Sequence, residues 1–118
     1  MGARTVQPVI GIADLADGEM VARDINGVSV LLCRVDGRYY AVANLCSHAG
    51  QRLAHGKLKG YELVCPLHRA RFDVRDGRCL AAPATQPIRT FPVTIERGKV
   101  HVEVAADRPG PPTVKLRF

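Results

Sequence analysis

The sequence predicts an all-β fold, and three observations support this prediction. Two dipeptides that favour tight hairpin turns, Asn26-Gly27 and Asp36-Gly37, stand close together in the first third of the chain. The run between them, residues 28–35, is nearly all apolar and rich in β-branched side chains. Near the other end, apolar and polar residues alternate on both sides of Arg97-Gly98, as they do in half-buried strands. Together these features indicate antiparallel strands joined by short turns.

The first third of the chain is expected to form a meander of strands. Residues 9–12 form a short apolar segment, and a turn-rich stretch leads from there to a strand over residues 19–24. The apolar run at residues 28–35 follows, and the next turn leads into a strand over residues 38–43. Because short turns connect these segments, each one is expected to pair with the next along the chain.

The remaining strands are predicted around two further turns. Residues 61–64 are expected to form a strand, and Asp76-Gly77 predicts a hairpin between residues 71–74 and 78–80. The last hairpin turns at Arg97-Gly98, and its alternating apolar side chains are Phe91, Val93 and Ile95 before the turn and Val100, Val102 and Val104 after it.

Two short motifs carry the chemistry of this chain, Cys46-Ser47-His48 and Cys65-Pro66-Leu67-His68. A closed four-ligand metal site needs thiolate sulfur and imidazole nitrogen held by two rigid loops, and each motif supplies one of each. The interleaved order suits a [2Fe-2S] cluster with both cysteines on one iron and both histidines on the other. A structural zinc ion takes the same residue types, although it usually groups like ligands as C-x-x-C and H-x(3–5)-H, so zinc remains an alternative.

These motifs resemble the two cluster-binding loops of the Rieske ferredoxins that serve bacterial ring-hydroxylating dioxygenases. The resemblance is strongest over residues 44–48 and 65–73 and extends more weakly over residues 5–104. It implies a Rieske-type antiparallel β-sheet sandwich with a small inserted cluster-binding subdomain at about residues 45–80. We therefore expect one domain over residues 1–104, in which a proline loop containing Pro83 covers the cluster, and a C-terminal tail over residues 105–118.

The same resemblance implies a function in electron transfer. Cys46, His48, Cys65 and His68 would hold one Rieske [2Fe-2S] cluster per chain. The chain would accept one electron from a flavin-containing NAD(P)H-dependent ferredoxin reductase and pass it to a terminal Rieske non-haem iron oxygenase. No side chain stands out as a nucleophile or general base, so the chain is expected to be a carrier rather than an enzyme. Two other functions remain open: the small Rieske subunit of an assimilatory nitrite reductase, and a zinc-stabilised interaction module.

Positive charge is concentrated in the segment that carries the ligand motifs. The whole chain has a formal net charge of +6, and residues 46–80 hold seven basic and three acidic side chains, whereas residues 1–45 hold four and five. Such a basic rim would steer an acidic partner surface toward the cluster. Its members are Arg52, Lys57, Lys59, Arg69 and Arg71. A nucleic-acid partner is not expected, because neither a helix-turn-helix pattern nor a series of stacking aromatics is present.

Length and hydropathy place further limits on the protein. A chain of 118 residues has room for one modest core and no second catalytic domain. We find neither a signal-peptide pattern at the N-terminus nor 18 consecutive apolar residues, so no membrane association is expected. We expect a cytoplasmic monomer, in which thiols serve as metal ligands rather than as disulfides.

Two cysteines and two histidines lie outside the ligand motifs. Cys33 is placed within an apolar strand and is expected to be a small buried side chain. Cys79 follows the second motif on a strand, where a packed structural role is favoured over a reactive thiol. His55 is expected on a solvated loop and His101 on the exposed face of the last strand, so neither is predicted to be a ligand. Gly56, next to His55, is expected to supply backbone freedom.

Four positions near the motifs bear on the reduction potential. Respiratory Rieske proteins link their two loops by a disulfide, and this chain has Gln51 and Leu67 at the corresponding positions. Those relatives also place Ser and Tyr hydroxyls near the cluster, where this chain has Ala70 and Phe72. The resemblance therefore implies a potential near the lower end of the Rieske range of roughly −150 to +300 mV.

Overall fold

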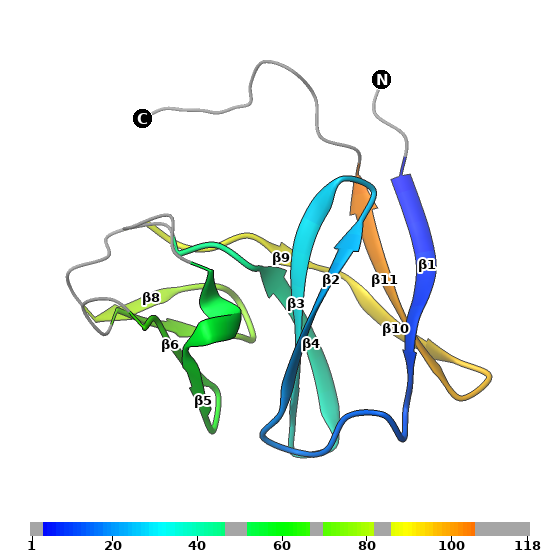
Figure 1. The fold of residues 1–118 in the computed structure, drawn as a ribbon, viewed down its shortest axis with the longest axis horizontal. Coiled ribbons are helices and arrows are strands. Elements are labelled where there is room, and N and C mark those ends of the chain that lie inside the picture. The colour runs from blue at the N-terminus through cyan, green and yellow to red at the C-terminus, as the bar shows by residue number, and fades with distance from the viewer. Residues whose placement is uncertain (1–3, 47–51, 67–69, 82–85, 106–118) are drawn as a thin grey trace.

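The fold consists of three antiparallel sheets and one short helical turn. The computed structural model describes residues 4–46, 52–66, 70–81 and 86–105. Two sheets have the strand orders β1-β11-β10 and β2-β3-β4-β9, and the third, smaller sheet has the order β5-β6-β7-β8 (Figure 1). Every described strand pairing is antiparallel, which confirms the predicted all-β class. The elements are β1 (Arg4–Gly11), β2 (Met20–Ile25), β3 (Val28–Val35), β4 (Arg38–Ala43), η1 (Leu53–His55), β5 (Lys57–Lys59), β6 (Glu62–Val64), β7 (Arg71–Asp73), β8 (Cys79–Ala81), β9 (Thr90–Phe91), β10 (Val93–Glu96) and β11 (Lys99–Ala105).

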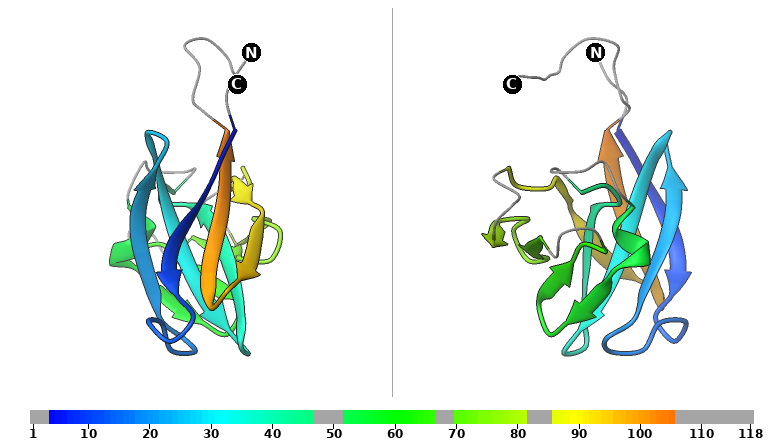
Figure 2. Two further views of the ribbon diagram at one scale, coloured as in Figure 1. Left: turned by 90° about the vertical axis from the view of Figure 1, so that its right-hand side faces the viewer. Right: turned by 60° about the vertical axis from the view of Figure 1, so that its left-hand side comes forward.

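The two larger sheets face each other and form a sandwich (Figure 2). Val100, Val102 and Val104 of β11 are fully buried in its core, so the alternation in the last strand indicates the buried face correctly. Val30 and Leu32 of β3 meet them from the opposite sheet. The third sheet, with η1, lies to one side of the sandwich as a smaller subdomain (Figure 1), and it is inserted in the sequence between the paired strands β4 and β9.

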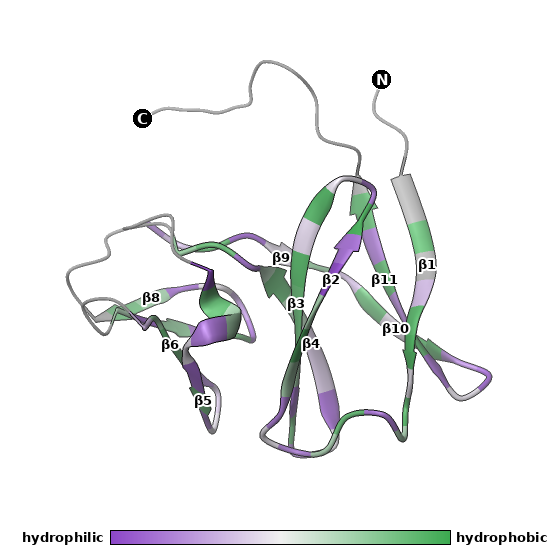
Figure 3. Ribbon diagram, viewed as in Figure 1, coloured by the Kyte–Doolittle hydropathy of each residue, from purple (hydrophilic) through white to green (hydrophobic). Residues whose placement is uncertain are grey.

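Strand β3 separates two hydrophobic cores. Val30 and Leu32 point into the sandwich, whereas Leu31 and Cys33 point toward the subdomain. Both faces of the strand are covered, which explains why its sequence is a continuous apolar run rather than an alternating one (Figure 3). The prediction for Cys33 is confirmed, because its side chain is fully buried and burial raises the pKa of its thiol to about 12.

Paired left-handed residues make the predicted hairpin turns. Asn26 and Gly27 have φ angles of 55° and 82°, and Asp36 and Gly37 have angles of 53° and 74°. Two consecutive positive φ angles are the mark of type I′ turns, whose twist matches that of the flanking strands. Arg97 and Gly98 turn the chain in the same way, with angles of 52° and 74°.

Two predicted hairpins differ from the structure. Phe91 does not belong to the last hairpin, because it lies in β9 and pairs with Ala41 of the other sheet. Pro92 separates β9 from β10, which fits the inability of proline to donate a ladder hydrogen bond. The Asp76-Gly77 turn is wider than a two-residue hairpin: β7 ends at Asp73 and β8 begins at Cys79.

The sequence did not predict η1 or β5, and it placed the start of β1 too late. β1 begins at Arg4 and pairs along β11, and its Ile10 is buried in the sandwich core opposite Val100. Both η1 and β5 are only three residues long, too short for hydrophobic periodicity to reveal them. Within the described ranges, no helix has the length and apolar character needed to cross a bilayer.

Candidate metal centre

Both cysteines of the ligand motifs lie at the subdomain end of the molecule. Cys46 comes three residues after β4 and Cys65 comes directly after β6. Each is 1% exposed, and both belong to the core that joins the subdomain to β3 and β4. His48 and His68 lie outside the described residues, so their assignment as ligands stays a prediction. Among the described residues, no three metal-binding side chains come together.

The chemistry of these two side chains fits an iron–sulfur cluster. All four cysteines lie in the described part of the chain, and each is a thiol rather than half of a disulfide. A thiolate is costly to bury unless a cation neutralises it, and iron–sulfur clusters are held by such thiolates. Cys46 and Cys65 are both buried; Cys65 directly follows β6, and Cys46 lies three residues beyond the end of β4.

The first loop is fastened at its base by Asn44, which is 2% exposed. Its backbone N–H donates to Ser29 O at 3.0 Å, and its Nδ2 lies 3.2 Å from Ser29 Oγ. Its Oδ1 accepts a hydrogen bond of 2.8 Å from the N–H of Ala54 in η1. One buried amide therefore ties the strand before Cys46 to the segment that follows the first loop.

Gly56 brings that segment against the second loop. Its N–H donates to Leu53 O at 2.9 Å and ends η1. An added Cβ at Gly56 would lie 1.9 Å from the carbonyl oxygen of Val64, the residue before Cys65. The φ of Gly56 is −88°, so glycine is needed here for close approach and not for a left-handed conformation. The expectation that Gly56 merely supplies backbone freedom was therefore wrong.

The second loop closes on itself immediately after β6. The N–H of Cys65 donates to Ala70 O at 2.8 Å, so a hydrogen bond spans the loop that contains Pro66. Ala70 and Phe72 are fully buried in the same core as Cys65. Pro66 itself is exposed. The ligand loop is thus anchored at both ends while Pro66 faces outward.

A buried carboxylate organises the turn behind this loop. Asp73 is 3% exposed, and it accepts bonds from Arg75 Nε at 3.0 Å and Arg75 Nη2 at 2.7 Å. Arg78 Nη2 lies 3.4 Å from the same carboxylate. Hydrogen bonds from Arg75 are the largest cause holding the pKa of Asp73 below its usual value, against the opposite effect of burial. The guanidinium of Arg75 also stacks on Tyr61, with its carbon 4.1 Å from the ring centroid.

Tyr61 in turn attaches the subdomain to the sandwich. Its hydroxyl donates to Asp36 Oδ2 at 3.2 Å, which lies in the turn between β3 and β4. Its ring meets Tyr40 of β4 edge to face, with centroids 6.0 Å apart. Since aromatic pairs favour this arrangement, the subdomain is held by oriented contacts as well as by apolar packing.

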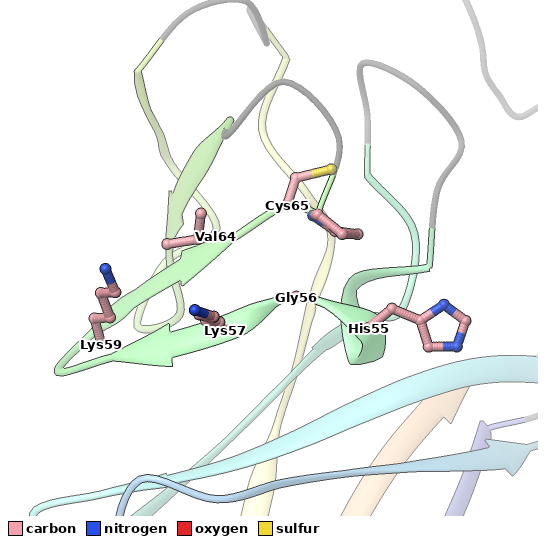
Figure 4. A pocket seen from close by; sticks show the side chains of 7 residues that line it. His55, Gly56, Lys57, Lys59, Val64 and Cys65 are labelled. Carbon is pink, nitrogen blue, oxygen red and sulfur yellow. The ribbon is translucent and has the colours of Figure 1, made fainter.

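A cleft runs beside Cys65 on the outside of the subdomain (Figure 4). Its lining comes from Val64 and Cys65 at the end of β6 and from Gly56, Lys57 and Lys59 on the adjoining segment, which pairs with β6. His55 is exposed at one end of this cleft, and it lies on η1 rather than on an irregular loop. It lines the surface next to Cys65 but belongs to neither ligand motif.

The predicted basic rim is only partly confirmed. Arg52, Lys57 and Lys59 are exposed, and the two lysines line the cleft that contains Cys65. Arg71 forms an ion pair with Glu62 at 3.1 Å, so its charge is offset locally. Arg69 lies outside the described residues. The positive surface therefore rests on fewer side chains than the sequence indicated.

Cys79 and His101, which lie outside the ligand motifs, are both half-buried. Cys79 is half-buried on β8 and packs against the core that contains Cys65, as expected of a structural thiol. His101 is on β11 as predicted but is half-buried, and its Nδ1 lies 3.3 Å from Lys99 O. Its predicted exposure was therefore too high.

Comparison with known proteins identifies the family. A family profile described as Rieske [2Fe-2S] domain matches residues 5–92. The chain belongs to the Rieske [2Fe-2S] family. It is 40% identical over 96 residues to the ferredoxin component of the naphthalene 1,2-dioxygenase system of Pseudomonas putida. The aligned region covers 81% of this chain and 92% of that relative.

Solved structures agree with this assignment. The ferredoxin of carbazole 1,9a-dioxygenase from Nocardioides aromaticivorans IC177 is 36% identical and superposes with a TM-score of 0.80 over 83% of this chain and 96% of that one. A ferredoxin chain in a complex of reduced oxygenase and oxidized ferredoxin of carbazole 1,9a-dioxygenase is 28% identical, with a TM-score of 0.78 over 81% of this chain and 99% of that one. The chain is thus a Rieske-type electron carrier with a [2Fe-2S] cofactor, which disfavours the zinc alternative.

Sequence reasoning missed two residues that shape this centre. Asn44 was not singled out, although a polar residue between an apolar strand and a ligand motif was a usable signal. Gly56 was noticed only as a flexible position, since nothing local in the sequence indicates its approach to Val64.

Proposed function

We propose that this Rieske protein accepts one electron from a flavin-containing NAD(P)H-dependent reductase and delivers it to a terminal Rieske non-haem iron oxygenase that hydroxylates aromatic rings. The main observation behind this proposal is the match to a dioxygenase ferredoxin component over 92% of that relative's length. The carbazole 1,9a-dioxygenase ferredoxin supports the second step, because it has been seen in complex with its oxygenase. We place the protein in the cytoplasm as a monomer without a nucleic-acid partner.

Four side chains are proposed to hold the cluster: Cys46, His48, Cys65 and His68. When bound, the cluster supplies a site for one electron that is gained and lost without bond making in the protein. The buried positions of Cys46 and Cys65 support this assignment. Residues 1–104 are proposed to be one domain with its cluster-binding segment at about residues 45–80, followed by a tail over residues 105–118.

The partner surface is proposed to surround the cleft beside Cys65. Lys57 and Lys59 line the cleft, and Arg52 is exposed on the neighbouring loop. Leu45, next to Cys46, is 53% exposed and offers an apolar side chain at this end of the molecule. An apolar contact within a positive surface suits docking of an acidic protein partner, since charge speeds the encounter and the apolar group stabilises the complex.

Spectroscopy of the isolated holoprotein tests the ligand assignment. The wild type should contain two irons and two acid-labile sulfides per chain, and after reduction it should give the low-average-g electron paramagnetic resonance signal of histidine-ligated clusters. His48→Ala and His68→Ala should each abolish this signal. His55→Ala and His101→Ala are matched controls and should retain it, because they lie outside both motifs. An unchanged spectrum in both ligand variants would mean that the ligands are misassigned.

Electron delivery tests the docking surface separately. The rate of electron transfer from reduced protein to a dioxygenase oxygenase should fall as salt is raised, because screening shortens the reach of charge to roughly 8 Å at physiological ionic strength. Lys57→Glu with Lys59→Glu should slow the low-salt rate. Lys99→Glu, on the β10–β11 hairpin, is the control for charge reversal away from this surface. Equal slowing by both would show that overall charge, and not this surface, guides the encounter.

A further inference from the structure

We propose that Asn44 is a positioning residue that couples the two cysteine loops through η1 and so fixes how the cluster is held. The Asn44 bridge consists of Asn44, η1, Gly56 and Val64. It runs from the strand end before Cys46 to the residue before Cys65. This inference rests on the proposed cluster site and goes beyond it, because it assigns a role to residues that are not ligands.

In the first half of the bridge, the side chain of Asn44 caps η1 although it lies ten residues earlier in the chain than the N–H that it binds. A short helical turn leaves its first N–H groups without partners inside the turn, and a side chain usually satisfies them from the N-cap position. The N-cap residue of η1, Arg52, makes no such bond. Asn44 replaces it from ten positions before Ala54, with its Oδ1 2.8 Å from Ala54 N. The first loop is therefore bracketed by a bond between its two sides.

The orientation of the Asn44 amide is fixed independently of that bond. Its Nδ2 lies 3.2 Å from Ser29 Oγ, and its backbone N–H donates to Ser29 O. Ser29 belongs to β3, the strand between the two cores. The amide thus has one side fastened to the sandwich and the other to η1, which places η1 relative to the strand that leads into Cys46.

The second half of the bridge connects η1 to the other cysteine. Leu53 of η1 is fully buried in the core that also contains Cys46 and Cys65. At the other end of η1, Gly56 lies so close to the Val64 carbonyl that no larger residue fits. Lys57 then pairs with Val64 in the ladder between β5 and β6. Movement of η1 would accordingly be passed to the residue that precedes Cys65.

The test compares the holoprotein with three variants. Asn44→Ala removes the bridge, whereas Asn44→Asp retains an oxygen that accepts from Ala54 N and another that accepts from the Ser29 hydroxyl. Asn26→Gly is the matched control: it removes a 3.1 Å bond from Asn26 Nδ2 to Val104 O while tolerating the φ of 55° at that position. The readouts are the rate at which a chelator bleaches the visible absorption, the g-values of the reduced protein, and the thermal midpoint.

Asn44→Ala should bleach about 10- to 100-fold faster than the wild type and shift the g-values, as expected when a group that orients a metal ligand is lost. Asn44→Asp should bleach within about threefold of the wild type, on the same scale. Asn26→Gly should lower the thermal midpoint but leave bleaching and g-values unchanged. If Asn44→Ala yields no folded holoprotein, Ser29→Ala carries the test, with an intermediate increase in bleaching expected.

Three results would overturn the proposal: Asn44→Ala bleaching no faster than Asn26→Gly, Asn44→Asp bleaching as fast as Asn44→Ala, or Ser29→Ala matching the wild type where it alone carries the test. The failure of the proposed cluster site looks different, because the wild type itself would then lack the reduced-state signal. The two ideas are therefore separated by the wild-type spectrum alone.

Discussion

Replacing Asp73 with asparagine should destabilise the protein at neutral pH by about 2 kcal/mol. The new NH2 group replaces one carboxylate oxygen, so the bonds from Arg75 Nη2 at 2.7 Å and Arg78 Nη2 at 3.4 Å lose their acceptor. A hydrogen bond to a charged group contributes about 1.5–3 kcal/mol. The second bond is long, and both arginine side chains are more than half exposed, so water partly compensates the loss. At about 4 °C per kcal/mol for a domain of this size, the thermal midpoint should fall by about 8 °C.

The effect should depend on pH in a defined direction. The pKa of Asp73 is depressed in the folded protein, chiefly by hydrogen bonds from Arg75. A carboxyl with a depressed pKa stabilises the fold above the unfolded-state pKa of about 3.9, and this contribution is lost as pH falls through the folded-state value. The difference between wild type and Asp73→Asn should therefore be constant from pH 7 to about pH 5 and shrink at lower pH.

Thermal unfolding followed by far-ultraviolet circular dichroism between pH 7 and pH 3 measures both effects. Glu62→Gln is the matched control, because it removes an ion pair with Arg71 in the same subdomain whose two side chains are 44% and 47% exposed. Exposed pairs contribute up to about 1 kcal/mol, so the control should shift the midpoint by a few degrees at most. A difference between wild type and Asp73→Asn that is absent at pH 7, or that grows as the pH falls, would refute the reasoning.

Two further predictions concern buried positions. Gly77→Ala should lower the free energy of unfolding by about 3 kcal/mol, because its Cβ would lie 2.1 Å from Ile88 O at a φ of 78°, whereas Gly60→Ala, in open space at a φ of 58°, should cost roughly 1 kcal/mol; equal midpoints in thermal unfolding would contradict this. Cys33 should resist alkylation by iodoacetamide at pH 8 in the native protein, since burial raises the pKa of its thiol to about 12, and labelling of Cys33 detected by mass spectrometry would show that the core opens more readily than its packing indicates.

The sequence predicted those parts of the fold whose signals are local. The turns at Asn26-Gly27, Asp36-Gly37 and Arg97-Gly98 were correct because each dipeptide itself favours the left-handed pair that a type I′ turn requires. Strand β3 was placed at its observed bounds because its apolar run lies between two such turns. The spacing of the two ligand motifs is local in the same sense, and those motifs alone are enough to indicate the family.

What the sequence did not predict depends on contacts between distant residues. Phe91 fitted the alternation of the last hairpin, yet it joins β4, because Pro92 interrupts the strand and the neighbouring sheet has an unfilled edge. The turn η1 forms where Asn44 caps it from ten residues away, and Gly56 is required by the Val64 carbonyl. Neither interaction leaves a pattern in the residues next to it, so only the folded chain reveals how the two cysteine loops are coupled.

The reduction potential is the property on which the buried side chains near Cys65 bear most directly. Ala70 and Phe72 are fully buried in the core that contains Cys65, and Ala70 O accepts the hydrogen bond from Cys65 N. Neither side chain has a hydroxyl to donate, whereas respiratory Rieske proteins have Ser and Tyr there. Donors to cluster sulfur stabilise the more negative, reduced state, so their lack should keep the potential near the lower end of the roughly −150 to +300 mV range.

Adding the two hydroxyls should therefore raise the potential. Ala70→Ser with Phe72→Tyr should shift the midpoint upward by tens of millivolts, where about 59 mV corresponds to a tenfold change in a one-electron equilibrium. Phe91→Tyr is the control, because it adds the same hydroxyl to the sandwich core, away from the core of Cys65. Protein-film voltammetry measures all three proteins. A wild-type midpoint well above zero would refute the low potential itself, and an equal shift in the control would show that the hydroxyls do not act at the cluster. A low potential would suit the proposed carrier role, because a carrier of low potential can reduce the oxygenase that follows it.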